Sequence, residues 1–501
     1  MWNVVAKAIA VKLALRQRLV LVGLPVWLGI ANLACALHAA ERPNVVFFLV
    51  DDLGYMDIGV YNPDTFYETP NVDRLAASGV RFTNGYAANP VCSPTRFSIL
   101  TGKYPTRAGC TNYFSGKKAG RFKPAPLNDQ MPLAEVTLAE AFKEGGYATF
   151  FAGKWHLGPG EAFWPEAQGF DVNMGGSTVA APMAERSISP LRQSQAQRWT
   201  GRGTPPDRLA SETVQFIRDH KDEPFLAYLA FYSVHTPLIG RPDLVEKYQR
   251  KAASISGQEF GPEEQNLPEN QPRQVRLLQK HAVYAAMVEA MDLAVGKVLD
   301  ALDEAGVAEN TVVCFMSDNG GLSTSEGSPT SNLPLRAGKG WLYEGGIREP
   351  YIVRWPTGAK PGLVCDVPVI STDFYPTLLD IADLPPRPEQ TLDGVSLVPL
   401  LTQSGNIQPR QLYWHYPHYS NQGGFPGGAV RDGDWKLLER YEDGRAHLYN
   451  LADDLSEQHD RAEAEPERVA SMRAALHSWY KTVDAQFLEP LRPDGPQPWR
   501  P

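Results

Sequence analysis

The chain has 501 residues, with 48 Lys and Arg against 57 Asp and Glu, so its formal net charge is −9 at pH 7. This length exceeds one ordinary hydrophobic core and predicts a large domain together with a smaller one. An apolar fraction of 43% and a charged fraction of 21% are typical of a globular protein. The acidic balance argues against a nucleic-acid partner, because nucleic acid requires basic surfaces, but it allows a local basic site for an acidic substrate.

The first 36 residues have the pattern of an export signal. A basic stretch precedes an apolar stretch over residues 19–33, and Ala34-Cys35-Ala36 fits a small-x-small cleavage site. An uncleaved membrane anchor is one alternative, but the apolar stretch is interrupted and short for a membrane span. Lipoprotein-type cleavage before the cysteine is another, which Asn32 disfavours. We predict a signal peptide over residues 1–36, a periplasmic or secreted protein, and no stable membrane association after cleavage.

Four short apolar segments each run directly into a polar cluster. They are residues 44–50 before Asp51-Asp52, 147–152 before Gly153-Lys154-Trp155-His156, 225–232 before Ser233-Val234-His235, and 311–316 before Ser317-Asp318-Asn319. Continuous apolar runs of this length are typical of strands covered on both faces. Ligands bind beyond the carboxyl ends of such strands when they form a parallel sheet, so the four clusters can converge on one site.

Helical patterns lie between these segments. Thr137 and Glu140 form a capping-box pair, and apolar residues recur at helical spacing from Tyr284 to Leu302. Alternation of strands and helices predicts an α/β fold with a large, mainly parallel sheet sandwiched by helices.

The chain changes in character after about residue 405. Short aromatic runs alternate with Gly and Pro, and two strand-like runs flank Asp443-Gly444, a hairpin-type turn. We predict a small antiparallel sheet followed by a helix over about residues 466–487. The expected organisation is a catalytic domain over residues 42–405 and a C-terminal α+β subdomain over residues 406–501.

Cys92 begins the run Cys92-Ser93-Pro94-Thr95-Arg96. Pro94 has a fixed φ and no N–H, which suits the first turn of a helix, so we expect Cys92 just before a helix N-terminus. Backbone N–H groups and the helix dipole favour anions there, and Arg96 adds a permanent positive charge. An oxyanion at position 92 would therefore be stabilised from two sides. The alternative is a small buried hydrophobic residue, as most free cysteines are.

Two of the polar clusters carry oxygen ligands. Asp51, Asp52, Asp318 and Asn319 offer four oxygen-bearing side chains, which suit a hard cation such as calcium or magnesium. Each pair by itself is also typical of a turn or a helix cap. Their shared position after strands of the same type favours the metal site.

Other residues in the clusters carry positive charge and titratable protons. Lys154, His156, His235 and Lys339 could bind an anionic ester, protonate a leaving oxygen and accept a proton during turnover. A single lysine is more often solvated, and a single histidine is more often an ordinary surface or core residue.

Six blocks of sequence, in order, resemble those of the type I sulfatases, the formylglycine-dependent, arylsulfatase-like enzymes. The blocks are Asp51-Asp52, Cys92-Ser93-Pro94-Thr95-Arg96, Gly153-Lys154-Trp155-His156-Leu157-Gly158, His235-Thr236-Pro237, Ser317-Asp318-Asn319-Gly320-Gly321, and residues 338–348. The likeness runs from about Pro43 to Pro399 and more loosely to Leu451. It implies an alkaline-phosphatase-like fold, conversion of Cys92 to formylglycine by a maturation enzyme, and hydrolysis of sulfate esters.

The resemblance also implies a role for each site residue. Arg96 and Lys154 would hold the hydrated aldehyde, one hydroxyl of which attacks sulfur to give a covalent sulfo-enzyme. His235 and Lys339 would bind the sulfate and protonate the departing alcohol. His156 would then take a proton from the second hydroxyl, so that sulfate is expelled. Calcium would be bound by Asp51, Asp52, Asp318, Asn319 and the modified Cys92.

The substrate is predicted from a loop and from the resemblance. Residues 414–419 and the Gly-rich residues 423–428 resemble a loop placed over the site, with His415 and His418 as candidate substrate-binding residues. An aromatic core of the small sheet is an equally good interpretation. Export and similarity to bacterial polysaccharide sulfatases favour a sulfated sugar as the substrate.

Two other functions fit parts of the pattern. A phosphodiesterase or phosphonate monoester hydrolase shares the fold and the metal site. A catalytically inactive carbohydrate-binding protein could have kept the scaffold, but it predicts the loss of a polar cluster, and none is lost.

Overall fold

The computed structural model describes residues 42–118, 120–178, 204–264 and 273–501. The predicted signal peptide over residues 1–36 lies outside the described residues. Residues 43–501 form one compact unit. Among the described residues, we find no helix with the length and apolar character needed to cross a membrane.

An eight-stranded sheet forms the centre of this unit, in the order β11-β2-β10-β9-β1-β6-β4-β5. Its strands are β1 (Asn44–Val50), β2 (Val80–Phe82), β4 (Ala148–Gly153), β5 (Val172–Met174), β6 (Phe225–Ala230), β9 (Thr311–Ser317), β10 (Tyr351–Arg354) and β11 (Leu363–Cys365). The four strands predicted from sequence, β9, β1, β6 and β4, are neighbours and pair in parallel. The prediction of a mainly parallel sheet is confirmed, with β10 antiparallel to both of its neighbours.

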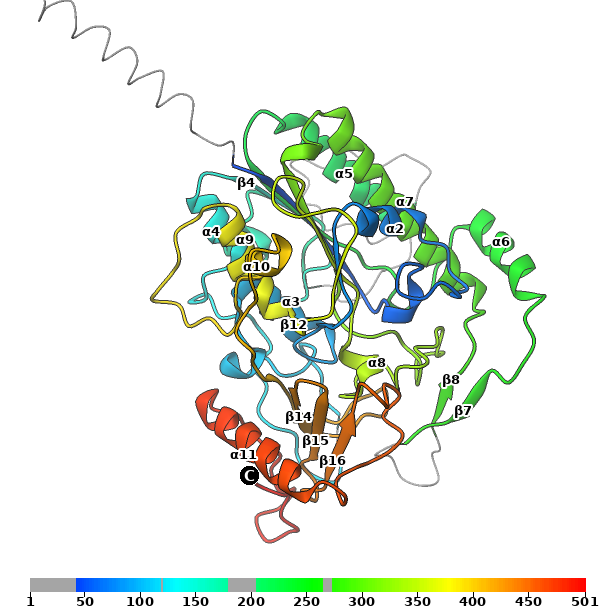
Figure 1. The fold of residues 1–501 in the computed structure, drawn as a ribbon, viewed down its shortest axis with the longest axis vertical. Helices are drawn as coiled ribbons and strands as arrows, with labels where there is room; N and C mark the ends of the chain where they lie inside the picture. The colour runs from blue at the N-terminus through cyan, green and yellow to red at the C-terminus, as the bar shows by residue number, and fades with distance from the viewer. Residues whose placement is uncertain (1–41, 119, 179–203, 265–272) are drawn as a thin grey trace, which may run out of the picture. The chain divides into compact units, whose positions relative to one another are not determined.

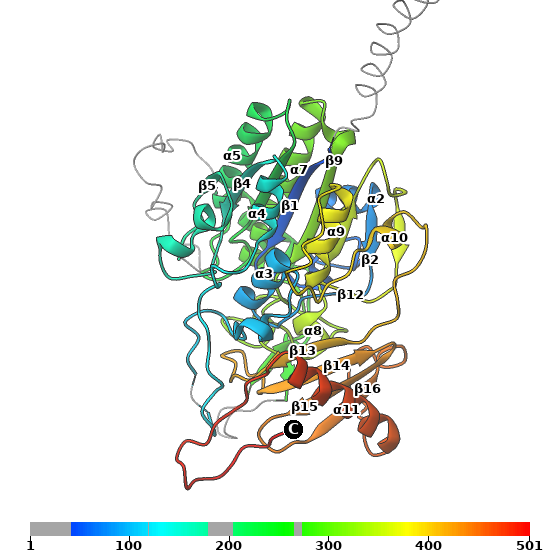
Figure 2. The same ribbon diagram turned by 90° about the vertical axis from the view of Figure 1, so that its left-hand side faces the viewer.

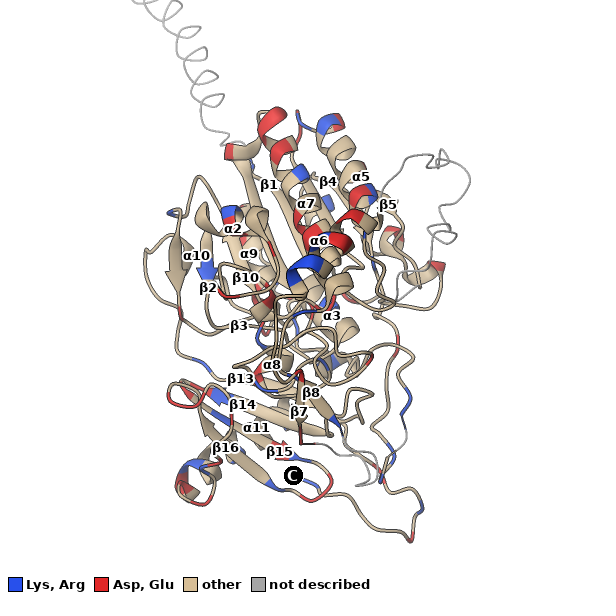
Figure 3. Cartoon of the chain, turned by 90° about the vertical axis from the view of Figure 1, so that its right-hand side faces the viewer, with Lys and Arg blue, Asp and Glu red and all other residues tan. Residues whose placement is uncertain are grey.

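Helices cover both faces of the sheet (Figures 1 and 2). Val46, Phe48 and Val50 of β1 pack in the cluster that includes α2, α5, α6 and α7, whereas the alternate residues of β1 pack in the cluster with α3, α4, α9 and α10. The helices are α2 (Pro70–Ala77), α3 (Cys92–Thr101), α4 (Leu138–Glu144), α5 (Pro205–Asp219), α6 (Pro242–Ala252), α7 (Ala282–Glu304), α8 (Glu344–Ile347), α9 (Phe374–Ile381) and α10 (Val398–Leu401). Charged residues mark α5, α6 and α7 in Figure 3, while β1 carries none.

Local signals behave as the sequence predicts. Thr137 caps α4 by accepting a hydrogen bond from the backbone N–H of Glu140, and the Glu140 carboxylate accepts one from the Thr137 N–H. Smaller elements link the main ones: the parallel pair β3 (Gly85–Tyr86) and β12 (Val369–Ile370), and the antiparallel pair β7 (Phe260–Pro262) and β8 (Gln274–Arg276).

A four-stranded antiparallel sheet follows, in the order β13-β14-β15-β16. Its strands are β13 (Leu412–Tyr416), β14 (Gly427–Asp432), β15 (Trp435–Arg440) and β16 (Ala446–Asn450), and α11 (Pro466–Thr482) packs on β14 and β15. The predicted small sheet and the Asp443-Gly444 turn are confirmed. The helix ends at Thr482 and not near 487, because Asp484 adopts a positive φ of 52°.

A buried ionic cluster joins this small sheet to α8. The Lys436 ammonium of β15 lies 2.9 Å from Glu344 and 2.9 Å from Glu457, and all three side chains are fully buried. Glu344 also accepts a hydrogen bond from the Tyr86 hydroxyl at 2.7 Å. Burial opposes ionisation of Glu344, but Lys436 outweighs it and lowers the pKa of this carboxyl to about 2. The cluster therefore fixes the segment that follows Lys339.

Removal of Lys436 should destabilise the protein strongly. We expect Lys436→Ala to lower the free energy of unfolding by about 3–5 kcal/mol, because it removes the nearest cation from two fully buried carboxyl groups and leaves Glu344 with the more distant Arg348 guanidinium at 3.4 Å. Urea denaturation measures the change. Lys123→Ala, which breaks the exposed pair of Lys123 with Glu489, is the matched control and should cost at most about 1 kcal/mol. Equal losses for the two variants would contradict the role of the cluster.

Candidate active site

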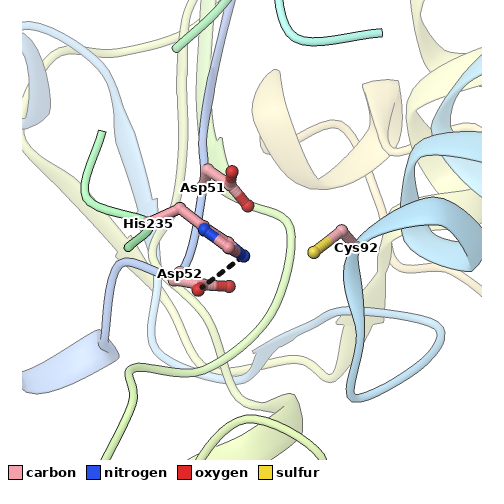
Figure 4. Close-up of side chains that lie close together, drawn as sticks. All are labelled: Asp51, Asp52, Cys92 and His235. Carbon is pink, nitrogen blue, oxygen red and sulfur yellow. Dashed lines mark ion pairs between the residues drawn. The ribbon is translucent and has the colours of Figure 1, made fainter. Parts of the chain in front are cut away.

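The four polar clusters meet beyond the carboxyl ends of β1, β4, β6 and β9. Figure 4 shows the side chains of Asp51, Asp52, Cys92 and His235 pointing toward one another. Ligand atoms of these four residues all lie within 4.8 Å of one another. The convergence predicted from the positions of the clusters is confirmed, and α3 brings Cys92 to the same place.

Asp51 and Asp318 are held by buried cations. The Lys154 ammonium donates to Asp51 at 2.7 Å, and the Arg96 guanidinium contacts Asp318 through Nε at 2.8 Å and Nη2 at 2.6 Å. Arg96 also donates to the backbone carbonyl of Lys154 at 2.7 Å. All four side chains are at most 2% exposed. The cations therefore keep these acids in place from the side of α3 and β4.

Asp52 is held from the other side. The Lys339 ammonium lies 2.8 Å from it, the Asn319 amide donates to it at 2.8 Å, and His235 Nε2 lies 3.7 Å away. Burial opposes ionisation of Asp52, but Lys339 outweighs it and lowers the pKa to about 2. Burial alone would lower the pKa of Lys339, yet Asp52 holds it well above its usual value. Lys339 is therefore a charged ammonium with a proton available.

The same residues fit a hard cation. Asp51 Oδ1 and Asn319 Oδ1 are buried and accept no hydrogen bond from any described residue. Burial raises the pKa of Asp51 to about 7 despite Lys154, so its ionised form lacks full compensation. Asp318 Oδ1 accepts a hydrogen bond from the backbone N–H of Asp52, with an N–O distance of 3.2 Å. Unsatisfied oxygen atoms on an acidic cluster are what calcium or magnesium would coordinate.

Cys92 is the first residue of α3, after Val91 in extended conformation. The expectation that Cys92 precedes the helix is off by one residue, although Pro94 does lie in the first turn, as the third residue of α3. The side chain is 2% exposed. Burial raises the pKa of the thiol to about 12 although Lys154 and Lys339 lower it. The unmodified thiol is therefore protonated and a poor nucleophile.

His156 enters the site through an unusual backbone. Gly153, with φ of 104°, ends β4 where a Cβ would lie 1.8 Å from the Ala230 carbonyl oxygen, so only glycine fits. His156 itself has φ of 58°. Burial and the Lys154 charge hold the pKa of His156 well below its usual value, and its buried Nδ1 has no hydrogen-bond partner among the described residues. The ring is a neutral imidazole that can accept a proton.

His235 has a fixed orientation. Its Nδ1 lies 2.6 Å from the Thr236 carbonyl oxygen, which requires that this nitrogen carry the proton and leaves Nε2 facing Asp52. Burial and the Lys339 charge lower the pKa of His235 to about 3. A bound anion beside Nε2 would raise this pKa, because opposite charge favours the protonated ring.

The two histidines expected at the substrate are buried and hydrogen-bonded within the protein. His415 is buried in the aromatic core of the small sheet, where Nδ1 is 2.6 Å from the Tyr441 hydroxyl and Nε2 is 2.8 Å from the Gln486 carbonyl oxygen. His418 is buried and lies 2.8 Å from Thr111 Oγ1. Both ring nitrogens of His415 are thus occupied within the protein, as the aromatic-core interpretation predicts.

Tyr416 is a residue that the sequence reasoning missed. It follows His415 on β13, so its side chain points to the opposite face of the strand. Its hydroxyl donates to Asn112 at 3.2 Å, and burial, together with the nearby Cys92, raises its pKa although Lys339 acts against it. The alternation of faces along β13 is the signal that could have distinguished the two residues.

Comparisons with known proteins agree with this geometry. The family model Sulfatase matches residues 43–384, and the model N-sulphoglucosamine sulphohydrolase, C-terminal, matches residues 337–485. A Sulfatase from Formosa agariphila is 32% identical over 88% of each chain, and Arylsulfatase A of Homo sapiens is 33% identical over 84% of this chain and 79% of its own. The crystal structure of Ps i-CgsB in complex with k-i-k-neocarrahexaose has a TM-score of 0.71 at 27% identity, and the match covers 88% of this chain and 93% of that one. The chain belongs to the sulfatase family of sulfate ester hydrolases.

Proposed function

We propose that this sulfatase hydrolyses sulfate esters of carbohydrates, with a formylglycine derived from Cys92 as its nucleophile. The observation that carries the proposal is the position of Cys92 at the start of α3, where its Sγ lies within 4.8 Å of ligand atoms of Asp51, Asp52 and His235. A residue so placed but so unreactive as a thiol makes chemical sense if a maturation enzyme oxidises it.

Two groups complete the site. Residue 92 as a hydrated aldehyde would supply the attacking hydroxyl and a second hydroxyl for the release of sulfate, and calcium would supply a hard positive charge for the sulfate oxygens. We assign Arg96, on α3, and Lys154, directly after β4, to the orientation of residue 92. Both side chains are buried in the site. The residues that would hold calcium are Asp51, Asp52, Asp318, Asn319 and residue 92.

The remaining residues bind the sulfate and move protons. Lys339 carries positive charge and protons next to Asp52, and His235 presents Nε2 to the same place. We assign both to sulfate binding and to protonation of the leaving alcohol, a step that needs a general acid when the alcohol is basic. His156, held neutral, accepts the proton during release of the sulfate.

Support for a carbohydrate substrate comes from the structural relative Ps i-CgsB, whose complex contains k-i-k-neocarrahexaose. The export pattern over residues 1–36 supports action on an external polysaccharide, in the periplasm or outside the cell.

The state of residue 92 tests the nucleophile. Protein produced together with a maturation enzyme should yield a tryptic peptide lighter than the cysteine form by mass spectrometry. Cys92→Ala should be inactive toward sulfate esters, whereas Cys365→Ala, at a half-buried cysteine on β11, should keep full activity. Full activity of Cys92→Ala, or a phosphate diester turned over in preference to a sulfate ester, would contradict the proposal.

Removal of metal tests the cation. A chelator should abolish turnover and lower the melting temperature, because Asp51 and Asn319 then keep unsatisfied oxygen atoms. Calcium should restore both properties, since the donor atoms are oxygen. Restoration by zinc alone would contradict this assignment and favour a phosphatase-like site.

Leaving-group dependence tests the acid. A sugar alkoxide is strongly basic and needs a proton in the transition state, whereas a nitrophenolate needs little help. His235→Ala should therefore lose about a hundredfold more activity on a sulfated sugar than on nitrophenyl sulfate.

The control is His156→Ala, which should slow both substrates alike and accumulate sulfate on residue 92, since release is common to them. Equal losses for His235→Ala on the two substrates would leave His235 as a sulfate-binding residue only.

A further inference from the structure

Two cationic side chains, Lys118 and Arg273, contact a loop formed by residues 420–424. The Lys118 ammonium donates to the Ser420 carbonyl oxygen at 2.7 Å, and the Arg273 guanidinium donates to the Thr324 carbonyl oxygen at 3.2 Å. Neither forms an ion pair with a carboxylate of the part of the chain that the structure describes. Lys247, in contrast, contacts both Glu68 and Glu289.

The loop lies directly against the residue that follows Lys339. A Cβ on Gly340 would lie 2.1 Å from Ser420 Oγ, and one on Gly424 would lie 1.9 Å from the Gly340 carbonyl oxygen. Only backbone without side chains allows this approach. Lys118 thus contacts, through Ser420, the loop that packs against the residue following Lys339.

Arg273 lies on the same loop. A Cβ on Gly423 would lie 2.7 Å from Arg273 Cδ and 2.9 Å from the Trp341 ring, so the guanidinium stem and the indole flank this glycine. The indole N–H of Trp341 donates a hydrogen bond to the Gln422 carbonyl oxygen at 3.1 Å, which holds the loop in place. Both cations are thus held by elements that also position the reaction site.

The pair is electrostatically incomplete. Burial lowers the pKa of Lys118, and the neighbouring Arg273 lowers it further. Burial also lowers the pKa of Arg273. Among the described residues, each side chain donates one hydrogen bond, to a carbonyl oxygen, while an ammonium has three donors and a guanidinium has five. Both are half-buried and so keep an open side on which an anion would satisfy the spare donors.

We propose that Lys118 and Arg273 form a second anion-binding subsite, which holds an anionic group on the sugar residue next to the sulfate ester that is cleaved. The anion is a sulfate ester or a uronic acid carboxylate, because both offer oxygen atoms that accept from ammonium and guanidinium donors. This inference rests on the proposed function and narrows it, since it makes an anionic neighbouring residue part of the preferred substrate.

The test uses sulfated disaccharides that differ only in the neighbouring residue. Three compounds carry a neutral sugar, a uronate or a second sulfate there, and nitrophenyl sulfate reports activity without any neighbour. Lys118→Met and Arg273→Met should each lower kcat/KM about tenfold on an anionic disaccharide, mainly through KM, because one hydrogen bond between charged groups is lost.

Several controls are matched to these variants. Activity of Lys118→Met and Arg273→Met on nitrophenyl sulfate and on the neutral disaccharide should stay unchanged. Lys117 is an exposed lysine one residue away, and Lys117→Met should leave kcat/KM unchanged on all four substrates. The advantage of the anionic disaccharides should also shrink at high ionic strength.

The outcomes separate the possibilities. A loss confined to the uronate or to the disulfated compound identifies the anion. Equal losses on all four substrates would show that the cations only support the loop, and wild-type enzyme that does not distinguish neutral from anionic neighbours would also overturn the subsite. Calorimetric binding of the disaccharides to Cys92→Ala protein keeps the two proposals apart. If wild type cleaves no sulfate ester but binding still depends on Lys118, the subsite stands and the proposed function fails.

Discussion

Charge compensation within a buried site is the constraint on which the rest of this structure depends. Three buried acids meet three buried cations: Asp51 with Lys154, Asp52 with Lys339, and Asp318 with Arg96. Removing any one partner would leave an unpaired buried charge, which is far more costly than never burying the pair. The pairs join segments 103 to 287 residues apart, so the strand order that makes β9, β1, β6 and β4 neighbours is what allows the site to exist.

The small C-terminal sheet is part of this arrangement and not an accessory to it. Lys339 belongs to a segment that is held at one end by the Glu344–Lys436 pair and at the other by the loop over residues 420–424. A Cβ on Gly346 would lie 2.1 Å from the Trp341 carbonyl oxygen, so the segment folds back on itself without room for side chains. The lysine that faces Asp52 thus takes its position from β15 as much as from the large sheet.

The sequence predicts an element well where its burial and its functional residues produce a pattern within a few consecutive positions. Apolar runs ending in Asp51-Asp52 or Asp318-Asn319 predicted both parallel strands and their convergence, because a parallel sheet puts such ends at one edge. The antiparallel placement of β10 had no such signal, since it depends on pairing across the sheet. The burial of His415 likewise involves a distant contact, because its Nε2 lies 2.8 Å from the carbonyl oxygen of Gln486, 71 positions along the chain.

The charge balance of the site also limits what it selects. Three acids and three cations leave it neutral in side-chain charge. A divalent cation with a singly charged sulfate ester would leave one net positive charge, which favours the negative charge that develops on the leaving oxygen. A phosphate monoester, with two negative charges, would cancel that surplus. A phosphate diester has the same single charge as a sulfate ester, so electrostatics cannot separate these two. Discrimination between them must come from shape, because a diester carries a second organic substituent where a sulfate ester has a bare oxygen.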